Sequence, residues 1–203
     1  MRLLAKDRQG TTLLELILVM GISAIIMVSV GHLIRTGVDY YFYSTTQLEV
    51  QRNSLLSMNL LAQELTSSTR EGLTTDNNAP NPGLVFAISR AADGSPKRGP
   101  AGNLLWTTIV TYYIDEVDGI KMLMRKEENL AVEEINPPDI AGLGKDIAYF
   151  RALPDPGRIM ARYISNLQTV ESTDSLNIVM TSEINEGRNW LEMDVSTTIV
   201  PRN

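Results

Sequence analysis

The feature that most constrains this chain is a run of 24 residues, Thr11 to Ile34, in which Glu15 is the one charged residue. As an α-helix the run would be about 36 Å long, since each residue adds about 1.5 Å. About 20 apolar residues suffice to cross the hydrocarbon core of a bilayer. A carboxylate in such a segment costs about 2.5–3.5 kcal/mol at the bilayer centre. We therefore expect a membrane helix over residues 11–34, and a partner for Glu15.

The ten residues before this segment form a short basic leader. Arg2, Lys6 and Arg8 outnumber Asp7, and the positive-inside tendency keeps such a leader in the cytoplasm. The rest of the chain would then lie beyond the membrane. An ordinary secretory signal fits poorly, because no small-residue cleavage site follows the apolar run.

The leader ends at Gly10 and is followed by Thr11-Thr12-Leu13-Leu14-Glu15 and the apolar run. This arrangement resembles the amino terminus of type IV prepilins and of the pseudopilins of type II secretion systems. The resemblance implies cleavage between Gly10 and Thr11 by a prepilin peptidase, followed by N-methylation of Thr11. The chain departs from the family pattern at Thr11, where phenylalanine is usual.

The resemblance also assigns Glu15 to assembly. After cleavage, the amino group of Thr11 and the Glu15 carboxylate would both lie at the apolar boundary. In a fibre, the carboxylate of one subunit could neutralise the amine of its neighbour, because two charges that are each costly in lipid are tolerated as a pair. The alternative is a single-pass signal-anchor protein with a periplasmic binding or sensing domain, in which Glu15 lies among lipid headgroups.

Composition excludes several classes of function. The 203 residues carry a net charge of −6, and removing the leader, with three basic residues and one acidic residue, takes it to −8. Such an acidic exported part is not expected to bind nucleic acid through clustered positive charge. There is no cysteine, and the single histidine, His32, lies near the outer end of the apolar run. Nucleophilic triads and His-based metal centres therefore cannot be assembled, and we expect no enzymatic activity.

Acidic residues gather near one predicted turn. Asp115, Glu116 and Asp118 offer oxygen ligands of the kind that Ca²⁺ prefers, and some pseudopilins bind calcium. However, the spacing is not that of an EF-hand, and acidic turns are usually solvated. These three residues are the candidates for a calcium site, but the preferred interpretation is a solvated turn without metal or cofactor.

Residues 35–70 contain no proline and one glycine, Gly37, and predict an amphipathic helix that continues the membrane helix. Its apolar face is expected to pack on a sheet. The residues assigned to that face are Tyr41, Leu48, Leu55, Met58, Ala62 and Leu65, whereas Glu64 falls on the polar side.

Residues 71–203 predict a globular head of antiparallel strands. A hairpin is expected to join Thr108–Asp115 to Ile120–Arg125 around Asp118-Gly119. Residues 147–152 are expected to form a strand, residues 74–83 a loop and residues 90–102 a mobile loop. A long helix followed by strands predicts an α+β fold, and the layout resembles the pilin fold, with a small antiparallel sheet on the helix. The long helix and the absence of cysteines resemble J-type minor pseudopilins and W-type minor pilins.

The resemblance implies a non-enzymatic minor pilin or pseudopilin that helps initiate or cap a type IV pilus-like or type II secretion fibre. Its expected partners are the prepilin peptidase, other minor pilins or pseudopilins, the major fibre subunit and the inner-membrane assembly platform. The expected location is the inner membrane, with one crossing and the head in the periplasm, and then a periplasmic or surface fibre.

Overall fold

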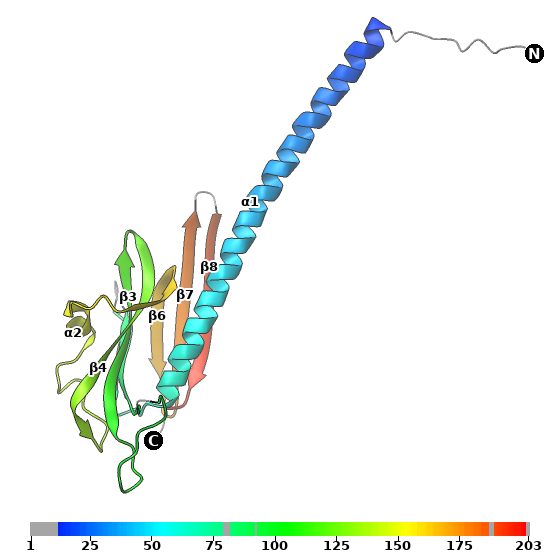
Figure 1. The fold of residues 1–203 in the computed structure, drawn as a ribbon. Coiled ribbons are helices and arrows are strands. Elements are labelled where there is room, and N and C mark those ends of the chain that lie inside the picture. Colours follow the sequence, from blue (N-terminus) through cyan, green and yellow to red (C-terminus); the bar gives the residue numbers. More distant parts are fainter. Residues whose placement is uncertain (1–11, 79–81, 92, 187–188, 202–203) are drawn as a thin grey trace, which may run out of the picture. The chain divides into compact units, whose positions relative to one another are not determined.

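The computed structural model describes residues 12–78, 82–91, 93–186 and 189–201. The chain forms two compact units, with the division between Thr46 and Gln47. The helix α1 (Leu13–Thr66) contributes to both (Figure 1). A long apolar helix followed by antiparallel strands confirms the predicted α+β class.

The first unit is the helical segment up to Thr46. Its apolar side chains are exposed, among them Leu13 at 79% and Met27 at 77%. Of the described helices, α1 is the one long and apolar enough to cross a membrane, and none of its most apolar stretch is buried. Such a helix near an amino terminus is compatible with a membrane span or a signal anchor.

α1 ends at Thr66, four residues before the expected boundary. The sequence there is Thr66-Ser67-Ser68-Thr69. The hydroxyls of Thr66 and Ser67 donate to the carbonyls of Gln63 and Glu64, at 2.8 and 2.6 Å. The Ser67 and Ser68 amides turn back to Glu64 and Leu65. Hydroxyl side chains compete with the helix for backbone groups in this way, which accounts for the early end.

The head has two antiparallel sheets, whereas one was expected. The five-stranded sheet has the order β1 (Leu73–Asp76), β2 (Gly83–Ile88), β3 (Trp106–Val117), β4 (Ile120–Glu134), β5 (Arg158–Arg162). The three-stranded sheet has the order β6 (Ile164–Glu171), β7 (Leu176–Glu186), β8 (Asn189–Ile199). Strand β1 begins one residue before the segment 74–83, which was expected to be a loop, and includes the first three residues of that segment.

The predicted hairpin is confirmed as β3 and β4. Asp118 and Gly119 have φ values of 54° and 76°, and two successive residues with positive φ characterise the type I′ turn that suits a two-residue hairpin. Residues 147–152, expected as a strand, instead form the helix α2 (Ile147–Ala152). The side chain of Asp146 caps it by accepting from the Tyr149 amide at 2.8 Å, and Ile147 and Phe150 supply its buried face.

Two hydrophobic cores lie on opposite faces of the five-stranded sheet. Val110, Tyr112 and Ile114 of β3 join the core that includes α1 and the three-stranded sheet. Ile109 and Tyr113, which alternate with them, join the core that includes α2. The alternation of Ile109, Thr111 and Tyr113 in the sequence is typical of a half-buried strand, but β3 is buried on both faces over most of its length.

The face of α1 that packs in the head differs from the predicted stripe. Met58 and Leu65 are buried as expected, but Leu48 and Leu55 are 62% and 51% exposed. The buried face is completed by two serines, Ser54 and Ser57, and by Val50 and Leu61. The hydroxyl of Ser54 lies 2.7 Å from that of Ser182 in β7, and Ser57 donates to the Met160 carbonyl in β5 at 2.8 Å. Each serine thus joins the helix to a different sheet.

Candidate functional site

The predicted cleavage site, Gly10–Thr11, lies outside the described residues. Glu15 is described, and it closes the first turn of α1. Its Oε2 accepts from the Thr12 amide at 3.0 Å and from the Thr12 hydroxyl at 3.2 Å. The Glu15 amide donates to the Thr12 hydroxyl oxygen at 3.3 Å.

These reciprocal contacts form a capping box, in which the residue before a helix and the residue three positions later satisfy each other's amides. The signal was present in the sequence as Thr12-Leu13-Leu14-Glu15, but sequence reasoning did not use it. Glu15 therefore has a partner in its own chain, and its carboxylate marks the start of the helix whether or not a neighbouring subunit is present.

His32 lies within α1, and its carbonyl accepts from the Thr36 hydroxyl at 3.0 Å. Its imidazole is exposed in the isolated chain. The structure gives no contact of the ring, among the described residues, that indicates a catalytic or ligating role.

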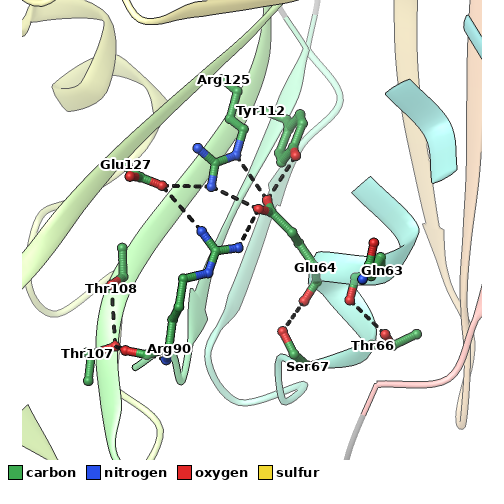
Figure 2. Close-up of polar contacts among 10 residues, drawn as sticks. All are labelled: Gln63, Glu64, Thr66, Ser67, Arg90, Thr107, Thr108, Tyr112, Arg125 and Glu127. Carbon is green, nitrogen blue, oxygen red and sulfur yellow. Dashed lines mark hydrogen bonds and ion pairs between the residues drawn. The ribbon is translucent and has the colours of Figure 1, made fainter. Parts of the chain in front are cut away.

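Within the head, the most developed polar site surrounds Glu64, near the end of α1 (Figure 2). Its carboxylate accepts two bonds from Arg125, from Nε to Oε2 at 3.0 Å and from Nη2 to Oε1 at 2.9 Å. Arg90 donates to Oε1 at 2.7 Å, and the Tyr112 hydroxyl donates to Oε2 at 2.8 Å. Both arginines also reach Glu127, with the nearest nitrogen and oxygen atoms 2.7 Å apart for Arg125 and 3.7 Å apart for Arg90.

The sheet register explains how these groups meet. Tyr112 of β3 lies directly opposite Arg125 of β4, and Val110 lies opposite Glu127. Residues two apart on a strand share a face, so Arg125 and Glu127 both face α1. Arg90 lies shortly after the end of β2. Glu64 is three residues after Leu61, one of the buried residues of α1, and therefore lies at the margin of the packed face.

The site is partly buried and balanced in charge. The side chains of Glu64 and Arg125 are 13% and 12% exposed, whereas those of Arg90 and Glu127 are 37% and 50% exposed. Burial alone would raise the pKa of the Glu64 carboxyl. The bonds and charge of Arg125, with the bonds from Arg90 and Tyr112, outweigh it and hold this pKa below its ordinary value. Burial, reinforced by the Glu64 charge, raises the pKa of Tyr112.

This arrangement fixes a charged carboxylate and does not prepare it for proton transfer. A general acid or base works best with a pKa near the working pH, and the surroundings of Glu64 move its pKa in the other direction. The two carboxylates and two guanidiniums compensate one another. The cluster of Glu64, Arg90, Arg125, Glu127 and Tyr112 therefore joins the end of α1 to β3, to β4 and to the segment after β2, and we call it the helix clamp.

Sequence reasoning missed the helix clamp because Glu64 was assigned to the solvent-facing side. Two signals were available. Glu64 is seven residues, or about two helical turns, after Ser57, but Ser57 was not recognised as buried. Arg125 was named only as the end of a hairpin strand, although an arginine that directly follows the apolar residues 122–124 in a strand needs an acceptor when it is buried with them.

The calcium candidates are placed around the β3–β4 turn. Asp115 is engaged by Arg151, 3.2 Å away, and also accepts from the Glu116 amide at 3.0 Å. Asp118 occupies a positive-φ position of the turn. No group of three or more metal-ligating side chains comes together in the described part of the chain.

The positively charged side chain of Lys126 makes a separate set of contacts deeper in the head. Lys126 is 5% exposed, and its Nζ donates to the carbonyls of Phe150 and Leu153 at 2.7 and 3.3 Å. It also lies 5.8 Å from the centre of the Tyr113 ring. Burial, with the charge of Asp115, raises the pKa of Tyr113 to about 12. Lys126 thus attaches the carboxyl end of α2 to the five-stranded sheet.

No family model, curated protein or solved structure matches this chain.

Proposed function

We propose that this protein is a non-enzymatic minor pilin or pseudopilin that helps to initiate or cap a type IV pilus-like or type II secretion fibre. The observation that carries the proposal is the junction at the start of α1. A basic leader ends at Gly10, and Glu15 follows five residues later at the head of a long apolar helix. The α+β head behind that helix is compatible with the pilin-like layout.

In this proposal the partners are the prepilin peptidase, other minor pilins or pseudopilins, the major subunit and the inner-membrane assembly platform. The apolar part of α1 holds the chain in the inner membrane and then packs among other helices in the fibre. Small residues such as Gly21 and Gly31 let helices approach closely in lipid, and a Cβ built at either position meets nothing within 4 Å beyond its own stretch of helix. The head contributes to the surface of the tip complex.

Mass spectrometry of the amino terminus tests this proposal. The full chain is expressed with and without a prepilin peptidase, and the expected mature chain begins at Thr11 only when the peptidase is present. Methylation would add one methyl group to that residue. A Gly10→Val variant serves as the control and should stay uncut. A chain that still begins with the leader in the presence of an active peptidase would exclude the fibre function.

The capping box favours a second candidate, the signal-anchor protein with a periplasmic binding or sensing domain. Glu15 is already satisfied by Thr12, so it needs no neighbouring subunit. The two candidates differ in what Glu15→Gln does. Glutamine can also complete a capping box, but it cannot neutralise an amine.

For a fibre subunit, we therefore expect Glu15→Gln and Glu15→Ala both to leave the protein in the membrane but out of the fibre. For a signal anchor, Glu15→Gln should behave like the unmodified chain in every assay. Co-purification with fibre subunits and membrane fractionation are the measurements. Unchanged co-purification of Glu15→Gln would show that charge pairing is not the mechanism.

A further inference from the structure

A cavity lies in the head beyond the end of α1. Its volume is about 550 Å³, which falls in the range of about 300–1,000 Å³ typical of ligand sites. Its walls come from Leu104, Trp106, Ile135 and Pro137, with Thr69 at the helix side. The cavity is formed entirely within the head, so its capacity to bind a ligand does not depend on processing at Gly10 or on fibre assembly.

Two polar groups in these walls have no hydrogen-bond partner among the described residues. Trp106 is 2% exposed, and no hydrogen bond of its indole N–H is found among the residues that the structure describes. Buried tryptophans usually give this proton to an acceptor. Thr69 Oγ1 is also buried and has no partner in the described part of the chain. Of the two, the Thr69 hydroxyl oxygen is fully enclosed and, within the described ranges, unpartnered, and a buried group of this kind destabilises the empty head.

The charges at the cavity favour a neutral ligand. The charged residues that line it, among those described, are Arg70 and Glu71, and they are of opposite sign. Arg70 is already engaged, because its guanidinium donates to the Thr173 carbonyl and lies 4.0 Å from Glu171. A phosphate or carboxylate would therefore find no uncompensated cation among these lining residues.

The lip of the cavity is apolar and exposed. Ile135, directly after β4, is 66% exposed although it lines the cavity. Tryptophan is enriched among the residues that carry most of the binding energy in protein–protein interfaces, and such residues lie in well-packed, desolvated pockets. A peptide group supplies what the walls lack, since its carbonyl can accept from the indole N–H and its amide can meet a hydroxyl.

We propose that this cavity binds a neutral, extended peptide segment of a partner protein, which inserts one aliphatic side chain between Trp106 and Ile135 and places a backbone carbonyl on the Trp106 indole N–H. Thr69 makes the second polar contact, with a peptide amide, once its side chain has rotated so that the buried hydroxyl faces the cavity. One aliphatic side chain supplies the apolar contact, and the hydrogen bonds of the flanking peptide groups fix the orientation of the bound peptide.

The experiment uses the two tryptophans of the chain, Trp106 and Trp190. The full chain, labelled with ¹⁵N-tryptophan in detergent micelles, gives two indole N–H resonances, and Trp190→Phe assigns them. The probe is the blocked peptide acetyl-Ala-Leu-Ala-amide. We expect it to shift the Trp106 indole proton downfield, as a new hydrogen bond requires, and to leave the Trp190 resonance in place.

Two variants form a matched pair. Ile135→Asp places a charge at the lip and should weaken binding about tenfold or more. Val132→Ser alters a side chain of β4 that is also exposed, at 72%, but does not line the cavity, and it should bind as the unmodified chain does. Thr69→Val, which removes the unpartnered hydroxyl, should weaken the peptide's binding while it stabilises the free protein.

Three outcomes would overturn the proposal. The first is an unmoved Trp106 resonance at saturating peptide. The second is an equal response to acetyl-Gly-Gly-Gly-amide, which lacks the aliphatic side chain. The third is tighter binding of isoamyl acetate than of the peptide, which would make the cavity a small-molecule site.

Discussion

Removing the Glu64 carboxylate tests the helix clamp directly. The substitution Glu64→Ala deletes the acceptor of four hydrogen bonds, two from Arg125 and one each from Arg90 and Tyr112. Arg125, at 12% exposure, keeps Glu127 as its remaining carboxylate. Breaking a buried pair by removing one partner costs about 3–5 kcal/mol. Because Glu127 stays and Arg90 reaches water, we expect about 3 kcal/mol, the lower end of that range.

The assay is urea unfolding of the full chain in detergent micelles, followed by the fluorescence of Trp106 in a Trp190→Phe background. Glu127→Ala is the matched control, since it removes the other carboxylate of the cluster. Glu127 is 50% exposed, and exposed pairs contribute about 0–1 kcal/mol. The double variant Glu64→Leu/Arg125→Leu should recover most of the loss, because it replaces a buried pair by apolar packing.

The dependence on pH gives an independent check of the same carboxylate. The folded head holds the pKa of Glu64 below its ordinary value. The unfolded chain therefore binds more protons as the pH falls below about 4.3, the ordinary pKa of glutamate, and this part of the stability is lost there. The difference between the unmodified chain and Glu64→Gln should be constant above about pH 6 and should shrink on acidification. The helix clamp would be refuted if Glu64→Ala lowered the free energy of unfolding no more than Glu127→Ala does, and if removing the Glu64 carboxylate did not change how stability falls at acidic pH.

Two further predictions concern the five-stranded sheet. Lys126→Met should leave the carbonyls of Phe150 and Leu153 without their donor, so we expect the free energy of unfolding to fall by about 1–3 kcal/mol and hydrogen exchange in α2 to become faster. Lys121→Met, at an exposed position, is the control. Unchanged exchange in α2 would contradict the attachment through Lys126. Gly83→Ala should destabilise the head by about 1–3 kcal/mol, because its Cβ would lie 2.6 Å from the Tyr112 carbonyl. Gly72→Ala, whose nearest neighbours would be 3.5 Å away, should be almost neutral, and equal urea midpoints for the two glycine variants would disprove the steric argument.

The parts of the fold that local chemistry determines were predictable. The turn at Asp118-Gly119 was readable because few other dipeptides accept two positive φ values. The long helix was readable because its apolar run contains no proline. Residues 147–152 were misread because Ile-Ala-Tyr-Phe suits a strand as well as a helix, and the decision rests on one capping residue, Asp146.

The parts that depend on contacts across the chain could not be predicted from hydrophobic periodicity. Leu48 and Leu55 fit an apolar stripe along the helix, whereas Ser54 and Ser57 do not. The two serines are nevertheless buried, because Ser182 and Met160 supply hydrogen-bond partners from remote strands. Glu64 was assigned to solvent for the same reason, since its arginines lie 26 and 61 residues away in sequence. Periodicity measures hydrophobicity along one helix and carries no information about such partners. Hydrophobic periodicity likewise gave no indication of the cavity at Trp106.

The serine contacts and the helix clamp have a mechanical consequence. Ser54, Ser57 and Glu64 attach α1 to the two sheets at three levels, which span about 15 Å of helix. A pull along the helix axis would strain all three attachments at once in shear, whereas a sideways pull would separate them in sequence. The head should therefore resist axial tension better than lateral peeling, and the serines, which contribute little apolar area, would carry part of that load.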